Sequence, residues 1–518
     1  MESYLARVEV DCSRGLPCFE MVGLLGSEVK EARERIRVAL KNADMQIPPM
    51  RITVNISPAS LHKEGTSYDL PVAAGILVAQ GLVPQEYVNR VMLAGELGLD
   101  GEVRPVRGIL PMVLEARKQG LTRCIIPAGN LREAGLVPDI RLTGIHRLEQ
   151  LEGILGGKEA GGEEGTKEGT QEAACVRRPG VAMAEGRAMA EEHVREEEYI
   201  LDFRDVVGQE GARRAAVTAA AGFHHMLMIG PPGTGKTMIA GCIPSILPPL
   251  TEEERLEVAS VRSVAGRPPG HGRPFVSLHH TVSAAAFLGG GRMPGPGAVS
   301  MAHRGVLFLD ELTEFRRATL DLLRQPLEEH RVRIARSGGS CCYPADFMLV
   351  GAMNPCPCGY YPDRNRCRCR DVEIRRYLNR ISGPILDRMD ICTEVERVEF
   401  DGLMRKKERE PAEDSASMRN RVLEARARQE RRFRDSPLHY NAQMGAEEIR
   451  RFCVLGTGEE RYLEQLFDAL RLSARSCHRL LRVARTLADL DGKERIGRPH
   501  LSEAACFRMA GEKYWGKE

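Results

Sequence analysis

The chain has 518 residues, of which 42% are hydrophobic, so it is too long for one ordinary domain and apolar enough to build two to four cores. Its formal net charge of +2 conceals a bias, because 62 of the 74 basic residues are arginines and 12 are lysines. Codon composition is the favoured explanation of this bias, and a preference for planar contacts to phosphate is the alternative. No apolar run reaches the roughly 18 residues that span a bilayer, and the first residues, MESYLARVEV, do not show a basic flank followed by an apolar core. We therefore expect a soluble cytoplasmic protein that does not bind membranes, whose 15 cysteines form no disulfide framework.

Changes in composition divide the chain into four parts. In residues 1–155, apolar runs such as ITVNI alternate with helix-like stretches such as SEVKEARERIRVALKNA, which predicts an α/β or α+β domain. Residues 156–198 are rich in Gly and Glu and almost lack large apolar side chains, so we expect a flexible linker. A second α/β domain follows over residues 199–400. Residues 401–518 begin with a charged stretch and continue with a helical pattern.

The stretch MLMIGPPGTGKTMIA contains a phosphate-binding loop between an apolar strand and a helix. In such a loop the backbone N–H groups surround the phosphates, the lysine reaches the β and γ oxygens, and the threonine hydroxyl binds Mg²⁺. The residues that we predict to bind ATP are Gly230, Pro231, Pro232, Gly233, Thr234, Gly235, Lys236 and Thr237. ATP and Mg²⁺ are therefore the predicted cofactors.

A second apolar strand, GVLFLDEL, ends in an acidic pair. Asp310 is expected to hold Mg²⁺ together with Thr237 and to belong to the ATP site, whereas Glu311 is expected to polarise the attacking water. An acidic pair at this place can also be an ordinary helix cap. Because it follows a phosphate loop, hydrolysis is the favoured interpretation.

Two polar residues further along the chain complete the predicted catalytic set. Asn354 ends the apolar strand DFMLVGAM, where its amide can contact the γ-phosphate or the attacking water, although Asn before Pro is also a common turn residue. Arg388 lies between Asp387 and Asp390. It is either one half of a local ion pair or an arginine presented to the ATP of a neighbouring subunit, where it would stabilise transition-state charge.

Four cysteines in NPCPCGYYPDRNRCRC form two Cys-x-Cys pairs: Cys356, Cys358, Cys367 and Cys369. Four thiolates satisfy the ligand count of a tetrahedral structural Zn²⁺, although Cys-x-Cys is tighter than the usual spacing. Disulfides are disfavoured in a reducing cytosol, while inert thiols and an iron–sulfur cluster are further alternatives. We predict zinc in a structural rather than a catalytic role.

Stretches spread over residues 199–510 resemble the magnesium-chelatase-like AAA+ ATPases, and within them the ComM/YifB group. They are DFRDVVGQEGARRAAVTAAAGFHHMLMIGPPGTGKTMIA, RPFVSLHHTVSAAAFLGGG, GVLFLDELTEF, NRISGPILDRMDI and LSARSCHRLLRVARTLADL. The resemblance implies an AAA+ P-loop α/β domain over 199–400, a C-terminal helical lid over 401–518, and a homo-hexamer with ATP between subunits. It also implies Asn354 as the sensor-1 residue, Arg388 as the arginine finger, and Arg475 as the sensor-2 arginine, acting in cis or in trans. A β-hairpin is implied before the sensor strand, and HRVRIARSGGSCCYPADFML suits either a pore-facing or a plain surface hairpin.

The N-terminal stretches KEGTSYDLPVAAGIL, GELGLDGEVRPVRGILPMVLEARKQG and CIIPAGN resemble the Lon-protease-like domain of the same group, a ribosomal-S5-like α+β fold. When active, that fold uses a serine nucleophile and a lysine base. Ala73 and Leu110 stand at these positions, which implies a scaffold or binding platform without the catalytic dyad. Ser67 and Lys63 nearby are expected to be surface residues. The family's domain starts with a further strand before VEVDCSRGLP, and we expect an exposed sheet edge in its absence.

DNA is the favoured load of the predicted motor, because ComM-like members resemble ring helicases that migrate branched DNA during recombination of incoming single strands, as in natural transformation. Two arginine-rich segments would supply basic faces: MRNRVLEARARQERRFR, and the helically spaced Arg471, Arg475, Arg479, Arg482 and Arg485. Solvated helices with ion pairs are the plainer interpretation of these segments. Alternative functions are a magnesium-chelatase-type subunit for metal insertion into a tetrapyrrole and a non-proteolytic protein-remodelling ATPase. A protease is disfavoured by Ala73 and Leu110.

Overall fold

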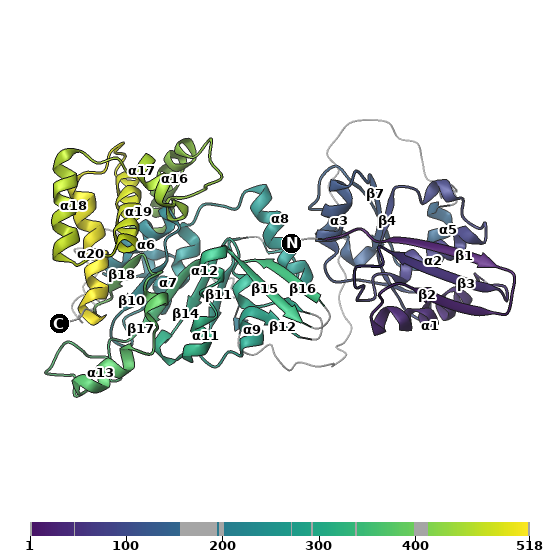
Figure 1. The fold of residues 1–518 in the computed structure, drawn as a ribbon, viewed down its shortest axis with the longest axis horizontal. Coiled ribbons are helices and arrows are strands. Elements are labelled where there is room, and N and C mark those ends of the chain that lie inside the picture. Colours follow the sequence, from purple (N-terminus) through teal and green to yellow (C-terminus); the bar gives the residue numbers. More distant parts are fainter. Residues whose placement is uncertain are drawn as a thin grey trace. The chain divides into compact units, whose positions relative to one another are not determined.

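The computed structural model describes residues 3–45, 47–155, 194–195, 201–270, 272–291, 294–336, 339–397 and 413–515. It contains two compact units, one formed mainly by Met1–Glu191 and one formed by Glu192–Val261, Gly270–Arg336 and Ser340–Glu518 (Figure 1). The predicted linker at 156–198 lies outside the described residues except for Val194–Arg195, and so does most of the charged stretch that follows residue 400. Among the described helices, none combines the length and the apolar character that crossing a membrane requires.

In its described residues, the first unit packs five helices and two short 3₁₀ turns around small sheets. The helices and turns are α1 (Ser27–Asn42), α2 (Asp69–Ala79), α3 (Ile109–Lys118), α4 (Leu131–Ala134), α5 (Glu149–Leu155), η1 (Gln85–Tyr87) and η2 (Ala128–Asn130). The strands are β1 (Arg7–Ser13), β2 (Cys18–Val22), β3 (Arg51–Ser57), β4 (Val91–Leu93), β5 (Glu96–Leu97), β6 (Val103–Arg104), β7 (Arg123–Pro127) and β8 (Arg141–Ile145). They form sheets of order β1-β3-β2, β4-β7-β8 and β5-β6, so that β1 is an edge strand. Helix α1 forms where predicted, because Val29, Ala32, Ile36 and Leu40 recur at helical spacing and are buried together.

The two positions that we expect to correspond to a protease dyad lie inside this unit. Ala73 on α2 and Leu110 on α3 are fully buried apolar residues, so neither offers a hydroxyl or an amine to a substrate. Ser67 is half-buried. The prediction that Lys63 is a surface residue is wrong, because it is 3% exposed and its ammonium group donates to the carbonyl of Pro58. That carbonyl supplies the partner that a buried charged group requires.

The second unit is organised by a six-stranded sheet. Its order is β18 (Ile391–Glu394), β10 (Met226–Ile229), β17 (Met348–Met353), β14 (Val306–Leu309), β11 (Phe275–Leu278) and β9 (Val194–Arg195). All neighbouring strands are parallel except β9, which is antiparallel to β11. Every residue of β10, β14 and β17 is buried, as expected for central parallel strands that are covered on both faces. The strands predicted before the phosphate loop, the acidic pair and Asn354 are therefore confirmed, and their carboxyl ends share one edge of the sheet.

Helices surround this sheet, and α16 to α20 gather to one side of it (Figure 1). The helices before the charged stretch are α6 (Glu210–Gly222), α7 (Lys236–Ile246), α8 (Glu252–Val264), α9 (Ala284–Leu288), α10 (Ala298–Met301), α11 (Arg317–Asp321), α12 (Pro326–Glu329), α13 (Asp371–Leu378) and α14 (Gly383–Leu386). Those after it are α16 (Ser415–Arg432), α17 (Ala446–Phe452), α18 (Thr457–Ala469), α19 (Ala474–Leu490) and α20 (Arg498–Trp515). Three 3₁₀ turns are η3 (Phe203–Asp205), η4 (Leu312–Glu314) and η5 (Asn441–Gln443). Apolar side chains of α6, α7, α16, α19 and the sheet share one core, which confirms the mixed α/β class with a helical C-terminal region.

Two small hairpins complete the part of the second unit that the structure describes. One pairs β12 (Gly289–Gly290) with β13 (Gly295–Pro296), and the other pairs β15 (Arg331–Arg336) with β16 (Gly339–Pro344). The second is the hairpin expected before the sensor strand. Its residues 337–338 lie outside the described part of the chain.

Candidate functional site

The predicted phosphate loop joins β10 to α7 at the carboxyl edge of the sheet. Gly233 and Gly235 have φ angles of +76° and +85°, a conformation that side chains rarely adopt. A Cβ atom on either glycine would meet nothing within 4 Å, so the space beside both is open to a ligand. Because α7 begins at Lys236, the loop presents its N–H groups at a helix N-terminus, where a phosphate is favoured.

Lys236 connects this loop to the end of β17. Its Nζ atom donates to the carbonyl oxygens of Gly230 at 2.8 Å and Pro231 at 2.7 Å, and to Oδ1 of Asn354 at 3.3 Å. Burial lowers the pKa of Lys236 to about 8, although the charges of Asp310 and Glu311 act in the opposite direction. The structure therefore brings together the lysine and the asparagine that the order of the motifs had suggested.

The end of β14 brings the acidic pair to the same edge. The hydroxyl of Thr237 donates to Oδ2 of Asp310 at 2.8 Å, so the two predicted Mg²⁺ ligands touch. Oxygen atoms of this kind suit Mg²⁺. Glu311 has a φ of +49°, which is uncommon for a residue with a side chain, and its N–H donates to Oδ1 of Asp310 at 2.9 Å. Such backbone strain is frequent at functional sites.

Glu311 also lies close to a histidine, His280, that the sequence motifs did not connect with it. Nδ1 of His280 lies 3.5 Å from a carboxylate oxygen of Glu311, whose side chain is 57% exposed. His280 follows β11, which pairs with β14, so the ends of adjacent parallel strands explain the contact. Together with His279 these residues hold their possible ligand atoms within 4.8 Å of one another. The order of the strands in the sheet is the signal that sequence reasoning lacked.

The two predicted arginines share one carboxylate. Arg388 and Arg475 both donate to Oε1 of Glu328, Arg475 from 3.4 Å. The side chain of Arg388 is 9% exposed, whereas that of Arg475 is 55% exposed. Both line a cavity of about 290 Å³, and its described lining includes no residue of the phosphate loop. Glu328 lies 60 residues before Arg388, and no pattern in the sequence pointed to it.

The neighbouring aspartates have other partners, so the local ion pairs considered for Arg388 do not form. Asp387 pairs with Arg479 at 3.5 Å. Asp390 is buried against His224, with 3.2 Å between the carboxylate and Nδ1. Burial raises the pKa of Asp390, but the hydrogen bond and charge of His224 outweigh that effect and lower it to about 2.

The arginine series on α19 does not form the basic face that its spacing suggested. Arg479 and Arg485 are 6% and 1% exposed, and Arg482 is half-buried with a hydrogen bond to the carbonyl of Ala442 at 3.1 Å. Only Arg471 and Arg475 of the series are exposed. The prediction fails because α19 packs among α6, α16 and α20, so that most of its faces are covered.

Several arginines of α16 are also engaged within the protein. Arg432 binds the carboxylate of Asp489, and Arg428 donates to the carbonyl of Asp489 at 3.1 Å. Arg419 donates to the carbonyl of Ser245 at 2.7 Å. Burial lowers the pKa of Arg426 to about 10. This segment is therefore largely a packing element, and it offers little evidence for a nucleic-acid surface.

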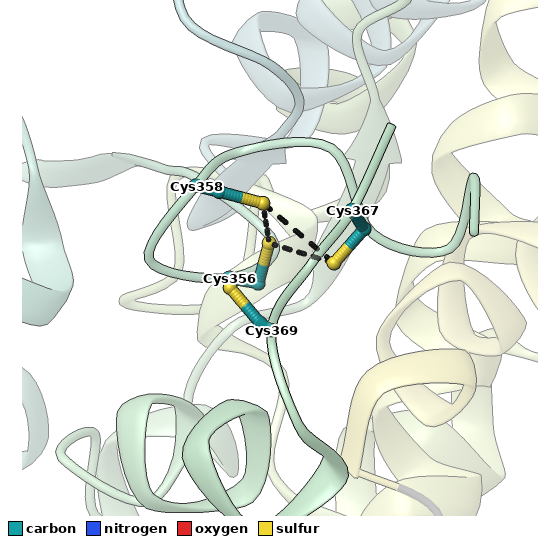
Figure 2. Close-up of side chains that lie close together, drawn as sticks. All are labelled: Cys356, Cys358, Cys367 and Cys369. Carbon is teal, nitrogen blue, oxygen red and sulfur yellow. Dashed lines mark hydrogen bonds between the residues drawn. The ribbon is translucent and has the colours of Figure 1, made fainter. Parts of the chain in front are cut away.

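The four predicted zinc ligands converge in the loop between β17 and α13 (Figure 2). The sulfur of Cys356 lies 3.4 Å from that of Cys358 and 3.8 Å from that of Cys367, and the last two are 3.6 Å apart. All four sulfurs, including that of Cys369, lie within 4.8 Å of one another, and none is in a disulfide. Four sulfurs about 2.3 Å from a tetrahedral Zn²⁺ would be separated by about 3.8 Å. The donor set and its spacing therefore fit Zn²⁺.

One of these thiols, that of Cys358, has a pKa below its ordinary value. Burial raises the pKa of Cys358, but the backbone N–H of Tyr360 and the neighbouring thiols stabilise the thiolate and lower the pKa to about 6. Thiolates are the form that binds metals.

A parallel sheet with a phosphate loop after one strand and an acidic pair at the end of another defines a P-loop nucleotide-binding protein. Three parts of the chain match one family: residues 202–403 match "Magnesium chelatase, subunit ChlI", residues 8–130 match "Subunit ChlI of Mg-chelatase", and residues 412–508 match "Magnesium chelatase, subunit ChlI C-terminal". The chain belongs to this magnesium chelatase family of AAA+ proteins. Membership supports an ATPase.

Comparison with individual proteins agrees with the resemblance to the ComM/YifB group. The chain is 41% identical over 505 residues to the uncharacterized protein YifB of Escherichia coli, covering 97% of this chain and 93% of the relative. It is 40% identical over 512 residues to the competence protein ComM of Haemophilus influenzae, covering 98% and 95%. A shorter similarity, 29% over 203 residues, is to Lon protease 2 of Bacillus subtilis and covers 33% and 36%.

Proposed function

We propose that this chain is an ATP-hydrolysing AAA+ motor that assembles as a hexamer and acts on single-stranded or branched DNA. Its activity would be branch migration or unwinding during recombination of incoming single strands, as in natural transformation, in the cytoplasm. The observation that carries the ATPase assignment is the pair of contacts at one sheet edge, Lys236 with Asn354 and Thr237 with Asp310. In this proposal residues 199–400 form the motor core, 401–518 the lid, 1–155 a platform and 156–198 a linker.

Each residue of the site has a distinct role in this proposal. The N–H groups of the phosphate loop and the ammonium group of Lys236 bind the phosphates. Thr237 and Asp310 hold Mg²⁺, which neutralises charge on the phosphates when it is bound. Glu311 accepts a proton from the attacking water, and Asn354 orients that water. His280 restrains Glu311 through the contact of 3.5 Å until the substrate is in place.

Arg388 and Arg475 would serve the ATP of a neighbouring subunit. Their common partner Glu328 and the cavity apart from the phosphate loop support a single place of action for both. We therefore infer that Arg475 acts in trans, together with Arg388. Both must exchange Glu328 for phosphate when the neighbour docks, and they then stabilise the charge of the transition state.

We assign the DNA contact to the β15–β16 hairpin rather than to the arginines of α16 and α19. On β15 the exposed Arg331 and Arg333 alternate with Val332 and Ile334, which are 2% and 7% exposed. One face of the strand is thus anchored, and the other presents two guanidinium groups suited to a phosphate backbone. Near-full-length similarity to a protein named for competence favours DNA over a tetrapyrrole system, although the family takes its name from magnesium chelatase.

A protein substrate is the remaining alternative, and DNA-dependent turnover separates it from the proposal. Gel shifts with forked and four-way DNA in the presence of ATP should show complexes, and those DNAs should stimulate hydrolysis. Lys236→Ala should lose ATP binding, while Glu311→Gln should bind ATP without turnover. Turnover close to that of the unmodified protein in either variant would refute the role of the substituted residue, and unchanged mobility without stimulation would refute the DNA assignment.

The hairpin is tested with a double variant, Arg331→Ala with Arg333→Ala. We expect basal ATP hydrolysis to persist while the affinity for DNA falls about tenfold or more, because two phosphate contacts are lost. The matched control is Arg450→Ala with Arg461→Ala, which removes two exposed arginines from α17 and α18. Equal losses of DNA affinity in the two double variants would show that binding depends on the total charge of the protein rather than on the hairpin.

A structural Zn²⁺ at Cys356, Cys358, Cys367 and Cys369 is also part of the proposal. The convergence of the four sulfurs within 4.8 Å supports it. Elemental analysis of freshly purified, reduced protein should find zinc bound to the chain, and its absence would remove this site.

A further inference from the structure

The cysteine loop, residues 354–370, packs directly against the phosphate loop. Gly359 lies between the two Cys-x-Cys pairs and has a φ of +85°. A Cβ atom on Gly359 would lie only 2.5 Å from Cδ of Pro232 and 3.7 Å from its backbone nitrogen. Two features therefore require glycine here, the backbone conformation and the close approach to Pro232. The two loops meet with no room for one more carbon atom.

A second contact joins the same segments at the start of the cysteine loop. Asn354 precedes Cys356 by two residues, and its Oδ1 atom accepts the hydrogen bond from Lys236 at 3.3 Å. Cys356 is fully buried, and its sulfur accepts a hydrogen bond from the N–H of Tyr361 at 3.4 Å. Within six residues the chain thus contacts the catalytic lysine, supplies two of the four sulfurs, and supports Pro232.

The cysteine loop lacks regular structure to hold it in place. Residues 354–370, all of them described, contain no helix or strand. Backbone hydrogen bonds are short in range, such as Gly359 N–H to the Cys356 carbonyl at 3.0 Å and Cys367 N–H to the Asp363 carbonyl at 2.8 Å. Ordering such a segment costs conformational entropy for every residue, so a cross-link between its two ends stabilises it strongly.

We propose that Zn²⁺ bound to the four cysteines holds the phosphate loop in its ATP-binding conformation, so that nucleotide affinity depends on the metal. This inference rests on the proposed ATP and zinc sites, and it gives the zinc a regulatory consequence beyond bracing a loop. Zinc fixes residues 356–369 as one body, Gly359 then supports Pro232, and Asn354 keeps its place beside Lys236. Without zinc the loop relaxes, and both supports of the phosphate loop weaken together.

The first experiment compares zinc-loaded and zinc-free full-length protein. Zinc is removed with a zinc-selective chelator, Mg²⁺ is kept in excess, and the Kd of a fluorescent ATP analogue is measured. We expect affinity to fall about tenfold, the effect of losing one charge-assisted hydrogen bond, and to return when Zn²⁺ is added back. Cys367→Ser should reproduce the loss, whereas Cys506→Ser, an exposed cysteine outside the cluster, should not.

The second experiment separates the contact from the metal. Gly359→Ala keeps all four cysteines and should still bind zinc, yet its ATP affinity should fall by a similar factor because the methyl group displaces Pro232. Gly120→Ala is the matched control, since Gly120 has a φ of +78° and nothing within 4 Å of an added Cβ. It carries comparable backbone strain without pressing on the phosphate loop, so its affinity should match the unmodified protein.

Each failure has a distinct meaning. If zinc-loaded protein binds no ATP, the proposed function is wrong. If the purified, reduced protein contains no zinc, both the proposed metal site and this inference are wrong. If zinc-free protein and Gly359→Ala both bind ATP with unchanged affinity, the coupling is overturned while the ATPase proposal stands. An affinity that falls without zinc and does not recover on adding Zn²⁺ reflects unfolding rather than coupling, and it would also overturn the inference.

Discussion

Asp489 is a fully buried carboxylate that ties α16, η5 and α19 together. It accepts hydrogen bonds from Arg432 at 2.8 Å and from the amide of Asn441 at 2.9 Å, and it pairs with Arg485 at 3.1 Å. The substitution Asp489→Asn keeps the shape of the side chain and removes its charge. It leaves two guanidinium groups inside the protein without their anion.

The cost follows from those contacts. Removing one partner of a buried ion pair typically destabilises a protein by about 3–5 kcal/mol, because the remaining charge stays desolvated. Arg485 keeps the carbonyls of Glu494 and Lys493, each at 2.6 Å, so part of its hydrogen bonding survives. We therefore expect a loss of about 3 kcal/mol in the free energy of unfolding of the helical region.

A neighbouring residue provides the control. Asp491 is 43% exposed and pairs with Arg214 at 3.4 Å and His500 at 3.3 Å. Asp491→Asn removes the same charge from an exposed pair and should cost less than about 1 kcal/mol.

The single tryptophan of the sequence reports on this region. Trp515, at the end of α20, donates its indole N–H to the carbonyl of Leu378 at 3.2 Å. Its fluorescence during denaturation in guanidinium chloride should show an earlier transition for Asp489→Asn than for Asp491→Asn. If the two variants differ by less than about 0.5 kcal/mol, Asp489 does not act as a buried anchor, and the reasoning is refuted.

Two further predictions concern the nucleotide site. Because the pKa of Lys236 is about 8 and bound phosphate favours its charged form, ATP affinity should weaken about tenfold per pH unit above pH 8. A Kd that stays constant from pH 7 to 9.5 would contradict this role of the ammonium group. Arg388→Ala should bind ATP and lose turnover by about a hundredfold or more, and mixing it with Lys236→Ala subunits should restore part of the activity. Mixed rings without any recovery would exclude action in trans.

Local motifs were predictable because their chemistry lies within a few consecutive residues. The phosphate loop and the quartet of cysteines each place their key atoms by short-range geometry, and the structure agrees for the convergence of the sulfurs. The contact of Thr237 with Asp310 joins two such motifs 73 residues apart, at the ends of parallel strands. The order of three apolar strands was enough to bring Asn354 to Lys236, because parallel strands end at one edge of a sheet.

The sequence by itself thus determined the family, the mixed α/β fold and the local chemistry of the phosphate loop. Helical periodicity states which residues share a face but not what covers that face, so only the packing of α19 showed that Arg479 and Arg485 are internal. The contacts of Glu328 with Arg388 and of Gly359 with Pro232 could likewise not be predicted, because the two residues of each pair lie far apart in the sequence. These features depend on the burial of side chains by distant segments and on close contacts between such segments. Both arise only when separate parts of the chain pack together.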